Sequence, residues 1–371
     1  MNKRIYVPVL LALALVLTGI TALHAADWNS FRGDKEMTGV AADGIAAGAR
    51  LLWTYETGSS INSTAAIVNG TVYVGTQGSK MLAINLADGK KKWEYATNNA
   101  ISASPLVANG KVYFGDETGI FYALSADTGK ELWKIETAGK IISSANISGT
   151  SVLVGSYDNS LYCLNANTGA TKWEFVSGAQ VHCTPCIADG KVMIAGCDST
   201  LHVIRLSDGK ELKSADLGSQ SAAGPAYNDG HVFLGTLKNG YSAVDIKDGT
   251  VSWTITDPDG EGECNAGATF VNGGAQVVFP SKNNKIFAVN SANGTLRWKF
   301  DTRDSVESSP VLSAGILYFG CDDGNIYGVD ANTGVSKWKY AAGSGVSASP
   351  AIANNRMVIG TGDGAVFCFG N

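Results

Sequence analysis

Short apolar segments separated by glycine turns follow one another along most of the chain. In the stretch 102–135 the turns are Asn109-Gly110, Glu117-Thr118-Gly119 and Asp127-Thr128-Gly129. Glycine in such turns supplies the positive φ of a tight hairpin, so neighbouring segments are predicted to pair as antiparallel strands. This stretch therefore predicts four short strands, at residues 102–108, 111–115, 120–124 and 131–135.

The four-strand pattern repeats about every 40 residues, and tryptophan marks nearly every copy. The repeated tryptophans are Trp53, Trp93, Trp133, Trp173, Trp253, Trp298 and Trp338. The position due at 213 has Lys213 instead. A period near 40 with four strands per unit is typical of a β-propeller, in which an aromatic residue at one position of each blade packs between blades. We therefore interpret the tryptophans as structural and expect a weaker contact at Lys213.

The two ends of the repeat array are each incomplete. The passage from second to third strand occurs eight times, but the last copy ends at Phe367-Cys368-Phe369 without a fourth strand. The segment 50–55 is a fourth strand without the other three. Pairing these two segments would complete an eighth blade and remove the open sheet edges. The sequence predicts an all-β fold, an eight-bladed β-propeller of four-stranded antiparallel blades at 49–371, closed by the N-terminal strand.

Residues 1–48 precede the repeats. Lys3 and Arg4, an apolar run and small residues ending at Ala25 follow the order of a secretory signal, so we expect residues 1–25 to be removed. Residues 26–48 are expected to form an extension that caps one face of the ring. No later segment has the apolar length of a membrane span, and no cysteine follows the signal to take a lipid anchor. We expect a periplasmic or secreted protein.

Composition narrows the function classes. Charged residues make up 16% of the chain and the formal net charge is −5, with no Lys/Arg-rich stretch, so we exclude a general nucleic-acid binder. Hydrophobic residues at 45% are ample for a core. The seven cysteines are odd in number and show no disulfide framework, so we expect most of them to be small buried hydrophobic residues.

One repeat carries a family resemblance. The segment from Ala123 to Trp133, Ala-Leu-Ser-Ala-Asp-Thr-Gly-Lys-Glu-Leu-Trp, resembles the repeat of the pyrroloquinoline-quinone (PQQ)-type propellers, and the other turns are looser copies. That family includes quinoprotein dehydrogenases and the non-catalytic outer-membrane assembly factor BamB. The opening 28–33, Trp-Asn-Ser-Phe-Arg-Gly, is similar to exported PQQ-like repeat proteins of unassigned role. The resemblance implies the fold, whereas the repeat itself identifies a blade and not a bound cofactor.

One set of aligned positions marks where a central site would lie. Aligning the copies places eight residues at one level, where the inner strands begin: Asn62, Ser102, Ile142, His182, Ala222, Asn265, Glu307 and Ser347. Only His182 and Glu307 titrate readily, and they belong to blades four and seven. They are either an acid–base pair, which needs both groups near one substrate, or satisfied polar groups that line a channel.

The run from His182 to Cys186 contains residue types that bind metals. On a strand, residues three apart point to opposite faces, so Cys183 and Cys186 are not expected to share an ion or a disulfide. The order also differs from that of attached haem, in which the histidine follows the cysteines. We therefore expect no metal or redox site here.

An insertion between the fourth strand of blade five and the inner strand of blade six is rich in carboxylates. They belong to Asp257, Asp259, Glu261 and Glu263. They could offer oxygen ligands to calcium, but the twelve-residue calcium-loop pattern is absent. The alternatives are a solvated acidic loop and a contact for a partner. With Asn265 and Glu307, these four residues form the predicted partner-binding rim.

Enzyme motifs are missing from the sequence. The dehydrogenases that the chain resembles carry an adjacent cysteine pair, calcium-binding side chains and a catalytic aspartate, whereas here no two cysteines are adjacent. Nucleophile, zinc and phosphate-loop motifs are also absent. We expect a monomeric, non-catalytic scaffold without PQQ or calcium that binds an envelope or periplasmic protein, with BamB-like support of outer-membrane protein assembly as one form. The alternatives are a PQQ-dependent quinoprotein dehydrogenase and a propeller that binds or senses a small ligand.

Overall fold

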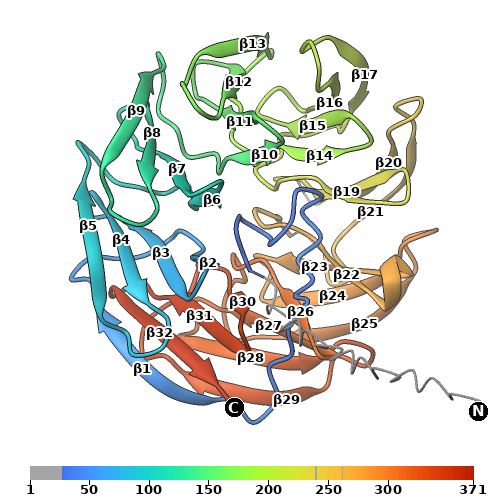
Figure 1. Ribbon diagram of the computed structural model, residues 1–371. Helices are drawn as coiled ribbons and strands as arrows, with labels where there is room; N and C mark the ends of the chain where they lie inside the picture. The colour runs from blue at the N-terminus through green and yellow to red at the C-terminus, as the bar shows by residue number, and fades with distance from the viewer. Residues whose placement is uncertain (1–26, 239, 261) are drawn as a thin grey trace, which may run out of the picture.

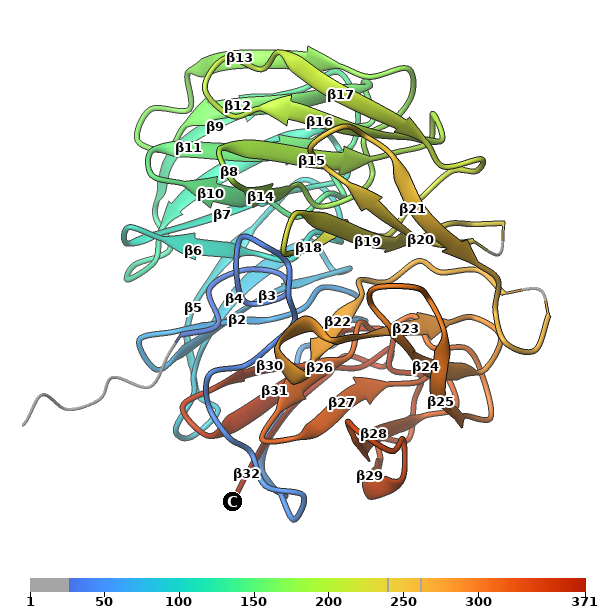
Figure 2. The same ribbon diagram turned by 90° about the vertical axis from the view of Figure 1, so that its right-hand side faces the viewer.

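Eight four-stranded antiparallel sheets form a closed ring in the computed structural model, which describes residues 27–238, 240–260 and 262–371 (Figure 1). Each sheet is one blade, and the blades stack around the ring with their short strands near its centre (Figure 2). The eight-bladed all-β propeller predicted from the repeat is confirmed. The predicted secretory signal lies outside the described residues. Within the part of the chain that the structure describes, no helix is long and apolar enough to cross a membrane.

The innermost strand of each blade has three residues, and the second strand has five or six. The innermost strands are β2 (Ala66–Val68), β6 (Leu106–Ala108), β10 (Asn146–Ser148), β14 (Cys186–Ala188), β18 (Ala226–Asn228), β22 (Thr269–Val271), β26 (Val311–Ser313) and β30 (Ala351–Ala353). The second strands are β3 (Thr71–Thr76), β7 (Lys111–Gly115), β11 (Ser151–Gly155), β15 (Lys191–Ala195), β19 (His231–Gly235), β23 (Gln276–Ser281), β27 (Ile316–Gly320) and β31 (Arg356–Gly360).

The two outer strands complete each blade. The third strands are β4 (Lys80–Asn85), β8 (Ile120–Ser125), β12 (Ser160–Asn165), β16 (Thr200–Arg205), β20 (Tyr241–Asp245), β24 (Lys285–Asn290), β28 (Asn325–Asp330) and β32 (Ala365–Gly370). The outermost strands are β5 (Lys91–Ala96), β9 (Glu131–Glu136), β13 (Thr171–Val176), β17 (Glu211–Asp216), β21 (Val251–Ile255), β25 (Leu296–Asp301), β29 (Ser336–Ala341) and β1 (Arg50–Glu56). A 3₁₀ turn, η1 (Asn272–Gly274), links β22 to β23.

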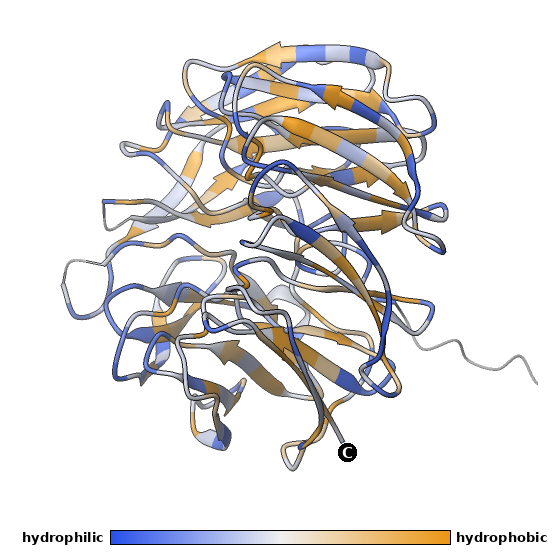
Figure 3. Ribbon diagram, turned by 90° about the vertical axis from the view of Figure 1, so that its left-hand side faces the viewer, coloured by the Kyte–Doolittle hydropathy of each residue, from blue (hydrophilic) through white to orange (hydrophobic). Residues whose placement is uncertain are grey.

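Burial follows the position of a strand in its blade. The middle of β8 is fully buried, because neighbouring blades cover both faces of the sheet, whereas β9 alternates exposed and half-buried residues. Figure 3 shows long hydrophobic stretches within the strands. The core is therefore a series of layers between blades.

The ring closes where the sequence predicts. Strand β1 pairs antiparallel with β32, with Arg50 opposite Gly370 and Glu56 opposite Ala365. The fourth strand of blade eight thus comes from the start of the repeat array, and β1 lies beside β32 in Figure 1. Closure gives β32 partners on both sides and completes the four strands of blade eight.

The repeated tryptophans pack between blades, as their spacing indicates. The indole N–H of Trp93 donates to the carbonyl oxygen of Ala126 in the next blade at 2.9 Å. The following turn places Gly129 against the same ring, where a Cβ would lie 2.8 Å from the indole. Gly129 also has a φ of +69°, so this turn needs glycine both for its backbone conformation and for the close approach of the ring.

The segment 27–49 crosses the centre of the ring and joins the blades to one another (Figure 1). Its carbonyl oxygens accept the backbone N–H of the middle residue of six innermost strands. The donors are Ile67, Val107, Ile187, Tyr227, Phe270 and Leu312. At β10 a side chain replaces the backbone donor, since Asn146 Nδ2 donates to the carbonyl oxygen of Lys35 at 2.9 Å. The segment therefore satisfies strand edges that would otherwise face the channel.

Arg32 anchors this segment in the ring. Its side chain is buried, and its Nη1 and Nη2 atoms donate to Pro310 O and Thr269 Oγ1, both at 2.6 Å. Burial lowers the pKa of Arg32 to about 9, against a smaller opposing effect of Asp34. A buried guanidinium held by uncharged oxygens fixes the segment across blades six and seven.

Candidate functional site

A polar cavity of about 150 Å³ lies at one mouth of the central channel. All eight residues that the repeat alignment puts at one level line it, so that alignment is correct. They are Asn62, Ser102, Ile142, His182, Ala222, Asn265, Glu307 and Ser347. Phe31 of the segment that crosses the ring also lines the cavity and gives it an aromatic wall.

A deeper layer of hydroxyl groups joins neighbouring blades. The backbone N–H of Thr64 donates to Ser104 Oγ, and that of Ser104 donates to Ser144 Oγ, each at 2.9 Å. On the other side of the ring, Ser309 N–H donates to Ser349 Oγ at 2.9 Å. These hydroxyl groups also line the cavity, and their oxygens already accept backbone protons. Their first role is therefore to hold the blades in register.

His182 and Glu307 have separate partners. His182 Nδ1 lies 2.6 Å from Tyr157 Oη, and burial together with the charge of Lys140 lowers the pKa of His182. Glu307 Oε1 lies 3.5 Å from Lys282 Nζ. The two residues line one cavity from blades four and seven, and each is engaged by its own neighbour. The geometry thus agrees with polar lining groups, the second of the two alternatives.

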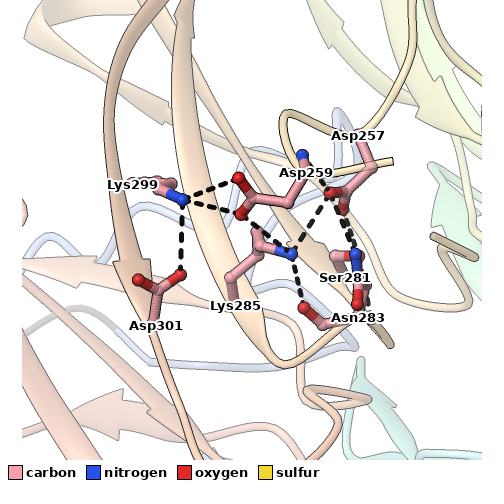
Figure 4. A network of polar contacts seen from close by, with 7 residues as sticks. All are labelled: Asp257, Asp259, Ser281, Asn283, Lys285, Lys299 and Asp301. Atoms are coloured by element: carbon pink, nitrogen blue, oxygen red, sulfur yellow. Dashed lines mark hydrogen bonds and ion pairs between the residues drawn. The ribbon is translucent and has the colours of Figure 1, made fainter. Parts of the chain in front are cut away.

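The acidic insertion folds back onto blade six. Asp257 is buried, accepts a hydrogen bond from Ser281 Oγ at 2.6 Å, and lies 3.2 Å from Lys285 Nζ (Figure 4). Asp259 lies 2.7 Å from Lys299 Nζ, whose hydrogen bond lowers the pKa of that carboxyl group. The prediction of a solvated acidic loop is therefore wrong for Asp257, because the side chain of Lys285, itself 4% exposed, is buried beside it.

The other predicted rim residues that the structure describes lie either at the rim or in the wall of the cavity. Glu261 lies outside the described residues. Glu263 and Glu307 remain at the rim, where both approach Lys282. Asn265 lines the cavity, and its Oδ1 atom is buried with no hydrogen-bond partner within the described residues. Of the predicted rim residues that the structure describes, Asp257 alone is buried.

The cysteines near His182 behave as buried structural residues. Cys183 Sγ accepts the backbone N–H of Ala195 at 3.2 Å, whereas Cys186 Sγ donates to the carbonyl oxygen of Glu36 at 3.3 Å. Burial raises the pKa of Cys183 to about 12 and raises that of Cys186. The two thiols thus have different partners. The expected reason is wrong, however, because Cys186 begins β14 whereas Cys183 lies before the strand. All seven cysteines are free, and six of them are buried.

One titratable residue, His202, was not predicted from the sequence. His202 on β16 lies between Asp198, 2.8 Å from Nε2, and Glu211, 2.6 Å from Nδ1. The repeat does indicate this residue. At the equivalent position of blade three, Tyr162 donates a hydrogen bond to Asp158. Aligning the third strands therefore shows that blade four has His202 where blade three has a tyrosine.

Comparison with known proteins identifies relatives of the fold. No match is found among curated proteins. BamB from Moraxella catarrhalis is 18% identical, with a TM-score of 0.75 over 87% of this chain and 100% of that chain. A quinohemoprotein alcohol dehydrogenase from Comamonas testosteroni is 15% identical, with a TM-score of 0.81 over 93% of this chain and 81% of that chain. The computationally designed Ika8 protein is 19% identical, with a TM-score of 0.76 over 87% of this chain and 100% of that chain.

These structural similarities are at low identity, so they show the fold alone. Sequence comparison goes further. The family model described as outer membrane protein assembly factor BamB matches residues 38–151, 136–212, 180–304 and 282–369. The matches overlap and extend through all eight blades. This chain therefore belongs to the family of the outer membrane protein assembly factor BamB.

Proposed function

We propose that this protein is an exported, non-catalytic scaffold that docks another envelope protein, in BamB-like support of outer-membrane protein assembly. One observation carries the proposal: a rigid, charged group of side chains on the rim of blades six and seven. It consists of Glu263, Lys282 and Glu307, which we call the rim cluster. The name of the family, an outer-membrane protein assembly factor, supports the envelope setting.

The rim cluster is accessible and held in place. Its side chains are 50%, 34% and 36% exposed for Glu263, Lys282 and Glu307. The backbone N–H of Lys282 donates to the carbonyl oxygen of Glu263 at 2.9 Å, which joins the turn between β23 and β24 to the loop that precedes β22. Because these groups are already ordered, a partner that binds them loses little conformational entropy. Two carboxylates around one ammonium favour a partner segment with basic side chains.

The cavity residues argue against the alternative of a quinoprotein dehydrogenase. PQQ carries three carboxylate groups, so a site for it needs cationic side chains that are not already paired. The cavity instead presents the carboxylate of Glu307, and Lys282 is engaged by two glutamates. Among residues 27–238, 240–260 and 262–371, no group of three or more His, Cys, Asp or Glu side chains is arranged to hold a metal ion. The residues do not fit the quinone, and we infer that the protein functions without PQQ or calcium.

Charge reversal on the rim tests the docking surface. The protein carrying Glu263→Lys and Glu307→Lys is crosslinked in envelope extracts beside the unmodified protein, and captured proteins are identified by mass spectrometry. The expected result is capture of an outer-membrane assembly protein by the unmodified chain and a loss of at least tenfold in the variant. Glu117→Lys, a reversal on the rim of blade two, is the matched control and should retain capture.

Two results would contradict the proposal. One is capture that survives reversal of both glutamates but is lost in Glu117→Lys, since that would move the docking surface to blade two. The other is micromolar binding of PQQ in a calorimetric titration with and without calcium, which would favour the dehydrogenase.

A further inference from the structure

Residues 27–49, which we call the strap, contact the ring as a bound peptide would. Apart from two isolated bridges, Trp28 with Ile67 and Val40 with Leu312, the strap belongs to none of the eight sheets. Its carbonyl oxygens accept the N–H groups of six innermost strands. Main-chain hydrogen bonds to a strand edge give a peptide affinity whatever its sequence, and pockets for its side chains give specificity. The strap therefore occupies strand edges that could bind another peptide.

Three side chains of the strap are buried among different blades: Trp28, Arg32 and Met37. Trp28 packs into the apolar core around blade one, and Met37 packs into the core of blades four to six. Glycines allow this close packing. A Cβ at Gly33 would lie 2.6 Å from the Trp28 ring, and a Cβ at Gly39 would overlap the Arg32 guanidinium. The ring thus accommodates an aromatic, an arginine and an apolar side chain from one segment.

Arg32 makes the most specific of these contacts. Its Nη1 and Nη2 atoms donate to Pro310 O and Thr269 Oγ1, both at 2.6 Å, and Nη2 also donates to Ala268 O. A guanidinium presents its donors in a fixed planar fork, which the single ammonium of lysine cannot reproduce. This group of oxygens, on blades six and seven, therefore recognises arginine.

The bound strap also has unfavourable contacts. Trp28 Nε1 and Arg32 Nε are buried and have no hydrogen-bond partner within the described residues. The oxygens that hold Arg32 are uncharged, and burial outweighs the favourable charge of Asp34 and lowers the pKa of Arg32 to about 9. Water would hydrate both N–H groups and the guanidinium charge, so these three features favour release of the strap.

Release of the strap would leave the ring closed. Strands β1 and β32 complete blade eight, and the strap contributes no strand to any blade. Release would uncover the six N–H groups and the oxygens that hold Arg32. Because unpaired backbone groups are unfavourable, a second peptide with the same groups gains the contacts that the strap gives up. Exchanging one segment for another therefore costs less than emptying the channel.

We propose that the centre of the ring is a binding site for an arginine-bearing peptide segment, and that the strap is its built-in competitor. The incoming segment displaces the strap and places its guanidinium between blades six and seven. A segment of another protein and the strap of a second copy share this chemistry. The site contains none of the rim-cluster residues, so the proposal does not rest on the scaffold role.

Peptide titrations test the site. A labelled synthetic peptide of residues 27–45 is titrated into the full protein, and fluorescence polarisation measures its Kd. The tethered strap competes at a high effective concentration, so the unmodified protein should bind the peptide weakly. Arg32→Met in the protein weakens the strap and should tighten binding of the unmodified peptide at least tenfold. The peptide that carries Arg32→Met should bind this variant protein at least tenfold more weakly.

Matched variants show whether the effect belongs to Arg32. Lys35 lies on the same strap, but its side chain is 49% exposed and pairs with Glu36 of the strap itself. Lys35→Met should therefore leave Kd within twofold of that of the unmodified protein. Gly39→Ala displaces the Arg32 guanidinium without removing it, and it replaces the methionine variant if that protein does not fold.

Two further measurements complete the test. Sedimentation of the Arg32→Met protein separates the sources, since a dimer that forms with rising concentration assigns the strap of a second copy, and a monomer assigns a segment of another protein. Hydrogen exchange of the unmodified protein detects release. The six N–H groups that donate to the strap should exchange together and at least tenfold faster than N–H groups bonded within the blades, because one opening exposes all six.

Three results would overturn the proposal. The first is the absence of saturable peptide binding by both the Arg32→Met and the Gly39→Ala proteins. The second is equal affinity of the two peptides, which would show that the ring does not recognise the arginine. The third is exchange of the six N–H groups no faster than exchange within the blades, which would make the strap a permanent part of the ring.

Discussion

Blades three and four have the same strands but different contacts with the next blade. In blade three the indole N–H of Trp173 donates to the carbonyl oxygen of Leu206 at 2.9 Å, and a Cβ on Gly209 would lie 2.7 Å from its ring. In blade four the equivalent residue is Lys213, which is exposed, and the turn glycine Gly249 meets backbone where the other blades have an indole. Blade four therefore lacks the apolar contact that joins the other blades at this position.

Blade four has an additional link within itself. Tyr162 of blade three donates only to Asp158, whereas His202 of blade four contacts Asp198 through one ring nitrogen and Glu211 through the other. Glu211 belongs to β17, so His202 links the third strand of the blade to the outermost strand. Blade four thus lacks the apolar contact with the next blade and has a polar contact between two of its own strands instead. A closed ring tolerates the exchange because its other blade contacts remain.

The largest expected effect comes from breaking the apolar contact. Trp173→Ala should lower the free energy of unfolding by about 3 kcal/mol, since it removes a large, half-buried side chain and its hydrogen bond. Lys213→Ala, at the same position in blade four, should change it by less than about 0.5 kcal/mol because the side chain is exposed. Urea denaturation measures both. Equal losses of unfolding free energy in the two variants would show that blades three and four do not differ in their contact with the next blade.

A smaller gain is expected from restoring the repeat residue. Lys213→Trp should raise the free energy of unfolding by about 1 kcal/mol, because the new ring can cover the turn at Gly249. Lys172→Trp, on the neighbouring blade at an exposed position beside Trp173, is the matched control and should give no gain. An equal rise in the urea midpoint of both variants would mean that any exposed tryptophan has this effect.

The smallest expected effect is a change in how the stability of the protein depends on acidic pH. Burial acts to raise the pKa of Asp198, but hydrogen bonds from Ser177 and His202 outweigh it and lower the pKa below the ordinary value of 3.8. A carboxyl group with a lowered pKa in the folded state stabilises the protein fully above its unfolded value, and this contribution is lost as the pH falls through the folded value. Unfolding measured from about pH 6 to about pH 2 should therefore show a shallower acid loss in Asp198→Asn than in the unmodified protein.

A second variant sharpens this last comparison. Ser177→Ala removes one of the two side-chain donors to Asp198 and should reduce the acid dependence in part. The effect is small because Asp198 is partly solvated, where screening weakens charged contacts. Identical acid curves for all three proteins would mean that Asp198 contributes nothing to stability in this range.

The sequence by itself determined the architecture. The spacing of the tryptophans and the glycine turns defined the blades, and the missing fourth strand after Phe369 identified segment 50–55 as its replacement. The same alignment put His182 and Glu307 at the level of one cavity. These features were predictable because each repeat forms one blade. Residues at the same position of the repeat therefore occupy the same position in each blade.

Only the tertiary structure decided the features that occur once. Asp257 looked solvated because nothing in its own loop reveals that Lys285, 28 residues later, is buried beside it. Arg32 bonds to the carbonyl oxygen of Pro310, which is 278 residues away, and no periodic signal connects the two. The unpartnered Asn265 Oδ1 likewise depends on which neighbours surround it in space. Local patterns fix strands and turns, whereas pairings between unique, distant side chains depend on how the closed ring brings them together.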